Sequence, residues 1–340
     1  MNGERVLVLG ASGFLGSHVT RQLVEAGYDV RVMVRRTSKL RAIDGLDVDY
    51  HYGDVFDDDA VRSAMSGCDV VFYCVVDTRA WLRDAAPLFR TNVEGLRRVL
   101  DIAADAGLRR FVFTSSIATI GRRDDGSRAT EADACNWAHL GGPYVESRVA
   151  AEQLVLDYCR DRHLPAVVLC VANTYGPDDW GSTPHGKLVD AAAHGRAVAY
   201  VAELAAEAVG IHDAALALCL AADKGRVGER YIISERFIGN REIFDIAADA
   251  TGARKPMVRI PLFVARLLGA CGDLWATVFR RDVLLTSVSV RLSYVMSPMD
   301  HTKATRELGW EPGPVPDSIR AAALFYRDRR RARALARSRT

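Results

Sequence analysis

A tyrosine and an arginine four residues apart are the side chains of this sequence with the clearest chemical use. Tyr144 and Arg148 fall on one face of the helix that we predict over Pro143 to Arg162, because residues i and i+4 are neighbours on a helix surface. A cation beside a phenol favours the phenolate, so such a tyrosine can give a proton to a carbonyl or take one from an alcohol. The pair also occurs by chance, and the hypothesis therefore depends on what surrounds it.

Two further polar positions are expected beside this pair. The segment Thr114-Ser115-Ser116 closes the strand predicted from Arg110 to Ser115, and a hydroxyl therefore emerges at the end of that strand. Asn92 lies on the helix predicted over Asp84 to Ala106. Ligands of open α/β sheets bind outside the carboxyl ends of the strands. We therefore predict a catalytic set in which a hydroxyl of residues 114–116 joins Tyr144 and Arg148, with Asn92 nearby, and works beside a hydride-carrying nicotinamide.

A glycine-rich turn near the start of the chain supplies the place for that cofactor. The stretch VLVLGASGFLG (residues 6–16) begins with four apolar residues typical of a buried parallel strand, and three glycines follow at regular spacing. Apolar residues then return at helical spacing, which indicates a strand, a tight turn and a helix. In that context backbone N–H groups can face a phosphate with no side chain in the way. The predicted cofactor-binding turn comprises Gly10, Ser12, Gly13, Phe14, Leu15 and Gly16.

The segment after the second predicted strand indicates which dinucleotide binds. This strand, Tyr28 to Val34, continues into Arg35-Arg36-Thr37-Ser38-Lys39 and offers no carboxylate for a ribose 2′-hydroxyl. A guanidinium suits a 2′-phosphate, so we predict NADP(H) over NAD(H), with Arg35 as the phosphate ligand. The alternative is that these cations are ordinary loop charges. After the third strand, Asp54 and Val55 are placed to meet the adenine.

Alternating strands and helices fill the first half of the chain and predict an α/β fold with a doubly wound parallel sheet. The remaining strands are expected over Val48 to Tyr52, Val70 to Val76 and Ala166 to Val171. Beyond residue 172 the rhythm breaks, and helices are expected over Pro261 to Val278, His301 to Leu308 and Pro316 to Arg327. We assign residues 1–171 and about 205–235 to the dinucleotide-binding domain. Residues 172–204 and 236–326 form a smaller, mostly helical substrate domain.

The composition of the chain limits the classes of protein to which it can belong. The chain has 340 residues, 49% of them apolar and 26% charged, and its seven cysteines form no C-x-x-C pair. We therefore expect no disulfide framework and no metal site. No signal peptide or membrane-spanning segment is predicted, so we expect a cytoplasmic protein without a nucleic-acid partner.

The net charge of +2 comes from residues 327–340, which hold seven Arg and one Asp. We expect this basic segment to be a disordered tail, with contact to an anionic surface as the alternative.

Six segments of the sequence resemble those of the extended short-chain dehydrogenases/reductases, in the NAD-dependent epimerase/dehydratase superfamily. The similarity is greatest to the branch of 3β-hydroxysteroid dehydrogenases, dihydroflavonol reductases and hopanoid-associated epimerases. The segments are GASGFLG (10–16), FVFTSSIATIG (111–121), YVESRVAAE (144–152), NTYGP (173–177), GIHDAA (210–215) and DHTKATRELGWEP (300–312). The resemblance implies a Rossmann fold and a cofactor site that also includes Val75, Asn92, Tyr144, Arg148 and Asn173. It further implies that Ser116, rather than Ser115, holds the substrate oxygen and that Tyr144 is the acid–base.

One position departs from this family. Its catalytic helix carries Tyr-x-x-x-Lys, and the lysine is Arg148 here. Arginine keeps the positive charge and can reach a ribose hydroxyl, but it cannot release a proton into a relay. Three outcomes stay open at this point: retained activity, reduced activity, or cofactor binding without turnover.

The class of substrate is predicted from the loops that we expect to cover the site. They carry Trp81, Trp180, His185 and Tyr200 with few charges nearby, which favours an apolar ligand. Plain packing is the alternative for each of these aromatic side chains. The apolar segment from Pro261 to Val278 is expected to be a core helix, with a helix lying on a membrane as the alternative.

These observations combine into one leading function and two rivals. The leading hypothesis is an NADP(H)-dependent oxidoreductase that moves a hydride to or from a steroid-, terpenoid- or polyketide-like small molecule. The rivals are a nucleotide-sugar epimerase or dehydratase, and an NADP-binding protein without turnover. Many relatives dimerise through the helices that correspond to 84–106 and 143–162, so a homodimer is also considered, as is peripheral membrane contact.

Overall fold

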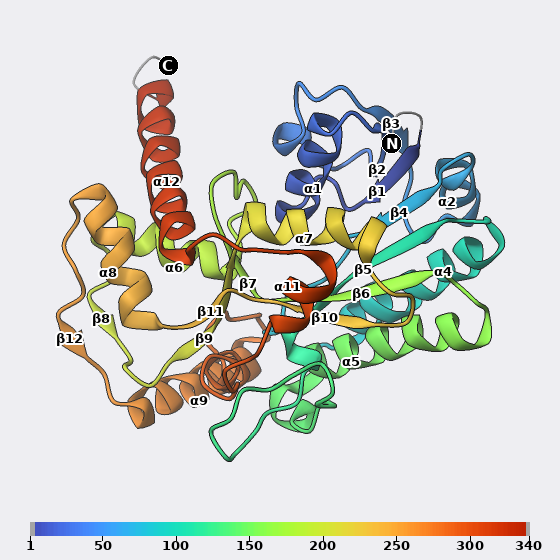
Figure 1. Ribbon diagram of the computed structural model, residues 1–340. Coiled ribbons are helices and arrows are strands. Elements are labelled where there is room, and N and C mark those ends of the chain that lie inside the picture. The colour runs from blue at the N-terminus through green and yellow to red at the C-terminus, as the bar shows by residue number, and fades with distance from the viewer. Residues whose placement is uncertain (1–3, 338–340) are drawn as a thin grey trace.

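Seven parallel strands form the central sheet of the molecule, in the order β10-β6-β5-β4-β1-β2-β3 (Figure 1). The computed structural model describes residues 4–337. The order reverses beside β1, as in a doubly wound sheet, so the predicted Rossmann topology is confirmed. The seven strands are β1 (Arg5–Leu9), β2 (Asp29–Val34), β3 (Asp49–Tyr52), β4 (Val70–Tyr73), β5 (Arg110–Ser116), β6 (Ala166–Val171) and β10 (Arg230–Ile233).

Helices cover both faces of this sheet. On one face α1 (Phe14–Glu25) packs against α7 (Ile211–Lys224), and on the other α4 (Leu96–Asp105) packs against α2 (Asp58–Met65) and α5 (Ala138–Asp161). Strands buried on both faces consist of continuous apolar runs. Every residue of 6–9 in β1 and of 166–170 in β6 is accordingly 0% exposed.

Beyond β6 the chain builds a second, smaller core from helices and two short sheets. The helices α6 (Pro184–Ala193), α8 (Asn240–Thr251) and α12 (Val315–Arg337) pack against one another. Three strands, β7 (Asn173–Tyr175), β9 (Ala205–Gly210) and β11 (Arg236–Gly239), form one sheet, and β8 (Ala199–Tyr200) pairs with β12 (Val258–Arg259). Within the segment 205–235, β9 belongs to the three-stranded sheet. Strand β10 belongs to the seven-stranded sheet, and α7 packs on that sheet.

Two helices differ from their predicted form close to the site. The helix expected over 84–106 is divided into α3 (Ala86–Phe89), a π-helical segment (Arg90–Gly95) and α4. A π-helical segment inserts an extra residue into the turn and is frequent at functional sites. Helix α5 begins at Ala138, but Gly142 interrupts it with φ 66° and ψ −165°, so its regular part begins at the predicted Pro143. Proline suits a first helical turn because its missing N–H would have no partner there.

The expectation that residues 261–278 form a core helix is wrong. Helix α9 (Leu262–Phe279) lies at the outer edge of the molecule, at the bottom of Figure 1. Phe263 is 68% exposed and Trp275 is 57% exposed. Among the described residues, α9 is the one helix that is long and apolar enough to cross a membrane, judged by length and composition.

The expectation of a disordered tail from residue 327 is also corrected. Helix α12 continues to Arg337 and projects from the top of the view in Figure 1. Two of its side chains bind the loop before α6: the Tyr326 hydroxyl donates to Asp179 Oδ2 at 2.6 Å, and Arg329 Nη2 donates to the Trp180 carbonyl oxygen at 3.0 Å. These contacts tie the helix to the body. Residues 338–340 lie outside the described part of the chain.

Candidate active site

The turn between β1 and α1 has the backbone that a dinucleotide phosphate requires. Gly10 has φ +88°, and a Cβ at this position would lie 2.8 Å from the carbonyl carbon of Cys74. A Cβ on Gly16 would overlap the Gly10 carbonyl oxygen. Gly13 is the N-cap of α1, no side chain caps this helix, and its first turn, which begins with Phe14 and Leu15, contains no acidic residue. The first N–H groups of α1 are therefore available to an anion, and Ser12 lies in the same turn.

The loops after β2 and β3 carry further side chains that were predicted to contact the cofactor. Arg35 is exposed, and its guanidinium has no hydrogen-bond or ionic partner within residues 4–337. The next cation, Arg36, lies over the Tyr52 ring at 5.2 Å. Asp54 accepts a hydrogen bond from the Phe56 N–H at 3.1 Å, which fixes the loop after β3.

Val55 and Val75 line the same edge of the sheet from two other loops. The Val55 side chain is buried, and Gly95 approaches it so closely that a Cβ there would lie 3.1 Å from Val55 Cγ2. Val75 follows β4, and its backbone nitrogen lies 3.0 Å from where a Gly10 Cβ would be. Glycine is required at position 10, where φ is positive and the backbone of residues 74 and 75 is in the way, whereas the atoms close to Gly95 belong to side chains.

The two serines at the end of β5 point in opposite directions, because successive side chains of a strand alternate. Ser115 is 4% exposed and donates to Glu152 Oε2 at 2.5 Å. Ser116 is half-buried, and its hydroxyl accepts the Ala118 N–H at 3.2 Å, which leaves its own proton free to donate. Ser116 is thus the serine that can hold a substrate oxygen.

Glu152 is a residue of this site that sequence reasoning missed. Its carboxylate accepts from Thr119 Oγ1 at 2.7 Å and from Arg230 Nη1 at 2.7 Å, in addition to Ser115. This buried cluster joins α5 to the carboxyl end of β5, to Thr119 beyond it and to the first residue of β10. The signal was present, since Glu152 ends the segment YVESRVAAE and lies one turn after Arg148 on the same helix.

Tyr144 lies in the first turns of α5 after the interruption at Gly142. Its ring is half-buried and packs in a cluster that includes Trp137 and Val295. Its hydroxyl forms no hydrogen bond with any described residue. The phenol is therefore positioned by packing of its ring, and its oxygen is available to an incoming substrate.

Arg148 is buried and has almost no partners. It is 1% exposed, and its Nη2 donates to the Thr114 carbonyl oxygen at 2.6 Å. Its guanidinium carbon lies 5.4 Å from the centroid of the Phe113 ring. Its Nε and Nη1 have no hydrogen-bond partner, and it forms no ion pair within residues 4–337. Buried donors are nearly always satisfied, so these two unpartnered nitrogens indicate a place for an acceptor that a bound molecule supplies.

Asn92, in the π-helical segment, positions α5 instead of facing a ligand. Its Oδ1 accepts the Asp77 N–H at 2.8 Å, and its Nδ2 donates to the Asp77 carbonyl oxygen at 3.0 Å and to Ser147 Oγ at 3.1 Å. Ser147 in turn donates to the Tyr144 carbonyl oxygen at 2.8 Å. These bonds use both Nδ2 protons and one lone pair of Oδ1, and they link Asn92 to the helix that carries Tyr144.

The NTYGP segment is held against α1. Asn173 opens β7 directly after β6, and the Pro177 carbonyl oxygen lies 3.2 Å from His18 Nε2. His18 is 2% exposed, and its ring meets His212 edge-on with 4.8 Å between centroids. Burial lowers the pKa of His18 to about 4, so this ring is neutral at physiological pH. Sequence reasoning did not select His18, because a lone histidine on a helix carries no spacing signal.

The four aromatic side chains predicted to contact substrate are not brought together. Trp180 packs edge-on against Phe325 at 4.8 Å, and the Arg41 guanidinium lies over its ring at 3.8 Å. Tyr200 is 9% exposed, and its hydroxyl accepts from Arg241 Nη1 at 3.1 Å. Packing therefore accounts for Trp180 and Tyr200.

His185 and Trp81 have different surroundings. The His185 ring lies 6.1 Å from the Tyr175 ring, and burial lowers its pKa to about 4. Trp81 is half-buried in the loop before α3. This loop is anchored by Arg83, whose N–H donates to Asp282 Oδ1 at 3.1 Å.

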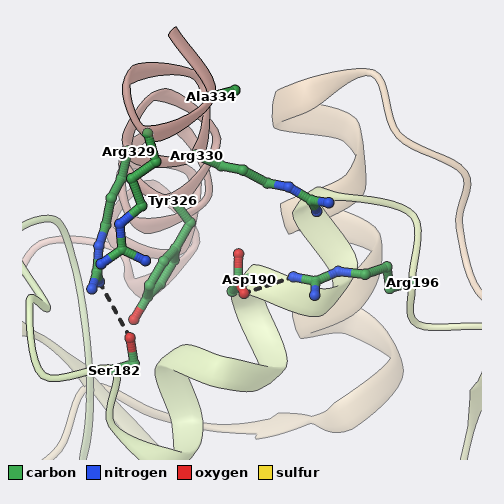
Figure 2. Close-up of a pocket in the computed structure, with 8 residues that line it drawn as sticks. Ser182, Asp190, Arg196, Tyr326, Arg329, Arg330 and Ala334 are labelled. Carbon is green, nitrogen blue, oxygen red and sulfur yellow. Dashed lines mark hydrogen bonds and ion pairs between the residues drawn. The ribbon is translucent and has the colours of Figure 1, made fainter. Parts of the chain in front are cut away.

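A cavity of about 710 Å³ lies elsewhere, between α6 and α12, and contains none of the predicted catalytic side chains. Figure 2 shows Arg330 extending across it toward Arg196, which pairs with Asp190 at 2.7 Å. Its lining residues are Ser182, Asp190, Arg196, Tyr326, Arg329, Arg330, Arg333 and Ala334.

The doubly wound sheet and the uncapped glycine turn after β1 define a dinucleotide-binding fold, and Ser116 at the end of β5 lies beside α5, which carries Tyr144 and Arg148. The chain belongs to the NAD-dependent epimerase/dehydratase family, whose model matches residues 6–234. The predicted membership among the extended short-chain dehydrogenases/reductases is confirmed, and a nicotinamide cofactor goes with it.

Three similar proteins illustrate this placement. The chain is 30% identical to the sterol demethylase protein B of Methylococcus capsulatus, over 95% of this chain and 98% of that protein. It is 27% identical to a 4-hydroxy-2-methyl-3-oxo-4-farnesyl-3,4-dihydroquinoline-1-oxide ketoreductase of Stigmatella aurantiaca, over 90% and 91% of the two chains. The crystal structure of gox2253 superimposes with a TM-score of 0.85 at 30% identity, covering 96% of this chain and 99% of that one.

Proposed function

We propose that this protein is an NADP(H)-dependent oxidoreductase that interconverts the carbonyl and the alcohol of an apolar small molecule. The observation that carries the proposal is the state of Arg148. A cation 1% exposed, with one hydrogen bond and two unpartnered nitrogens, is costly to the fold by itself. It becomes favourable when a polar molecule, such as the ribose of a nicotinamide nucleotide, supplies acceptors beside the end of β5.

The side chains around Arg148 divide the chemistry. When bound, the nicotinamide gives a hydride to the carbonyl carbon or takes one from the alcohol carbon. In the reductive direction the Tyr144 hydroxyl gives its proton to the oxygen of the same carbonyl, and solvent restores that proton. The Ser116 hydroxyl donates a hydrogen bond to this oxygen and fixes its position. Arg148 supports the negative charge that Tyr144 carries after the transfer.

The preference for NADP(H) is supported by Arg35, whose guanidinium is exposed and unpartnered in the described structure. A guanidinium provides two donors in the geometry of a phosphate. An apolar substrate is supported by the two relatives above, whose names specify a sterol and a farnesylated quinoline.

The test is a panel of apolar ketones, apolar alcohols and nucleotide sugars, each with both cofactors and read by the absorbance of the reduced nicotinamide. We expect apolar ketones to oxidise NADPH in preference to NADH. Arg35→Asp should reduce or invert this preference, whereas Arg254→Asp, at an exposed arginine of the second half, should leave it unchanged.

Two results would contradict the proposal. Conversion of nucleotide sugars with no net change in the cofactor would favour an epimerase. Tight NADP binding with no turnover of any ketone or alcohol would favour a binding protein. Equal affinities for the two cofactors, measured by calorimetry on the native protein, would remove the role of Arg35.

A further inference from the structure

Helix α9 exposes a continuous apolar face that nothing in the described chain covers. Seven large side chains along it are 46% to 68% exposed, and Leu284 and Leu285 continue the surface beyond its end. We call these nine residues the α9 face. They are Phe263, Leu267, Leu268, Leu274, Trp275, Val278, Phe279, Leu284 and Leu285.

The opposite side of α9 is fixed to the protein through small residues. Ala265, Gly269 and Ala276 are buried there, and a Cβ on Gly269 would lie 3.1 Å from the Ser287 backbone. The Asp273 carboxylate also accepts the Ser287 N–H at 3.3 Å, at the start of α10 (Ser287–Leu292). The helix is thus held lengthwise against α10. Its side-on attachment and the mid-helix Asp273 are unfavourable for a helix that crosses a bilayer.

Cations flank the α9 face. Arg280 and Arg281 at its carboxyl end are exposed and have no hydrogen-bond or ionic partner within residues 4–337. Arg266 lies over the Tyr294 ring at 4.8 Å, near the other end of the helix. Arg83, on the loop that contacts Asp282, adds another exposed cation. An apolar face that contains a tryptophan and is bordered by arginines is complementary to the interface of an anionic membrane.

The α9 face adjoins the side of the molecule that carries Tyr144. Arg291 of α10 donates to the Leu140 carbonyl oxygen at 3.1 Å, just before the interruption of α5. Leu292 packs in the same cluster as the Tyr144 ring. In Figure 1 α9 lies at the lower edge of the view and the carboxyl-terminal part of α12 at the upper edge, so these two basic segments lie on opposite sides of the molecule in this view.

We propose that the α9 face docks this protein side-on to the surface of an anionic lipid bilayer, without crossing it. A second copy of the chain fits this face less well. Cations lie near both ends of the helix and outnumber the exposed carboxylate of Asp282, so a two-fold contact in either orientation would bring an excess of like charge together. The proposal goes beyond the proposed function, and its test needs no turnover, so the two can fail independently.

The experiment is sedimentation of the full-length protein with two kinds of vesicle, phosphatidylcholine alone and phosphatidylcholine mixed with phosphatidylglycerol. We expect binding to the mixed vesicles and weaker binding to phosphatidylcholine. The double variant Arg280→Gln/Arg281→Gln should bind the mixed vesicles about 25-fold less tightly, at roughly fivefold for each cation. Leu267→Ser/Val278→Ser should lose tenfold or more. Val227→Ser is the matched control, because this valine is 51% exposed but precedes β10, and it should bind as the native protein does.

A spectroscopic readout locates the contact. Lipids with brominated acyl chains quench a tryptophan that enters the interface, so the native protein should lose fluorescence and Trp275→Phe should not. Trp137 and Trp310, which are 1% and 0% exposed, serve as internal references.

Each of three results would overturn the proposal. The first is absence of binding to mixed vesicles. The second is a native dimer in sedimentation velocity that Leu267→Ser/Val278→Ser converts to monomers, which would assign the face to a second copy. The third is retention of the protein on vesicles through an alkaline carbonate wash, which would indicate a helix that spans the bilayer.

Discussion

Replacing Arg148 by methionine should raise the stability of the cofactor-free protein and lower its turnover. The side chain is 1% exposed, donates one hydrogen bond to the Thr114 carbonyl oxygen and leaves two of its nitrogens unpartnered. Methionine fills a similar volume without a charge. The substitution therefore removes both a favourable bond and an unfavourable burial.

The two contributions can be compared. A hydrogen bond to a charged group contributes about 1.5–3 kcal/mol to the free energy of unfolding. Burial of a cation without a counter-ion costs several kcal/mol, and apolar replacement of buried charges often stabilises by about 1–4 kcal/mol. We therefore expect Arg148→Met to stabilise the cofactor-free protein by about 1–3 kcal/mol. Turnover should fall on the order of a hundredfold or more, because Tyr144 loses the adjacent cation.

The assay pairs urea unfolding of the cofactor-free protein with NADPH oxidation by a ketone substrate. Arg148→Lys is the matched control, since it restores the charge and the family's usual residue, and it should turn over at or above the native rate. A methionine variant that is destabilised by more than about 2 kcal/mol would show that the arginine is a structural residue. A methionine variant that keeps most of the native rate would remove Arg148 from the mechanism.

Three further outcomes are expected. Tyr144→Phe should abolish turnover and leave NADP affinity nearly unchanged, because only the proton donor is lost; substantial residual activity would exclude Tyr144 as the acid–base. The folded-state pKa of His18 is about 4, below its usual 6.5, so the free energy of unfolding should fall as pH drops from 6.5 toward 4, by at most about 3 kcal/mol from this group. Urea unfolding at several pH values should give a shallower dependence for His18→Gln, and an identical slope would refute this origin. Gly10→Ala should destabilise by on the order of 2 kcal/mol or more, and calorimetry should show a smaller loss for Gly45→Ala, which has φ +76° but no atom within 4 Å of its Cβ; equal losses would mean that the contact with Cys74 does not matter.

The large sheet could be predicted from the sequence because its strands are buried on both faces. Runs such as residues 6–9 and 166–171 have no polar interruption, and the glycine turn marks where the first of them ends. The short strands of the second half left no such pattern: β8 and β12 have two residues each. Their pairing is decided by contacts between distant segments.

The difference between local patterns and contacts between distant segments also explains which parts of the site could be predicted. The choice of Ser116 over Ser115 agrees with strand alternation, which is local information. Trp180 could not be judged locally, because its ring is covered by Phe325, far away in the sequence. The burial of α9 was misjudged because hydropathy alone does not say which face of a helix is covered. The small residues from Ala265 to Ala276 recur at helical spacing, and this pattern indicates a narrow contact side.

The ion pair between Glu152 and Arg230 has a consequence for the order in which the protein is made. The two residues are 78 positions apart, so at about 5–20 residues per second the ribosome adds Arg230 roughly 4–16 s after Glu152. During that interval the helix that carries Tyr144 and Arg148 lacks the partner that joins it to the edge of the sheet. We therefore expect the first half of the nascent chain to acquire its helices before it acquires a fixed site. Stalled chains of increasing length, probed with a protease, should show protection of α5 only once β10 has emerged; protection in shorter chains would show that the first half folds to completion without it.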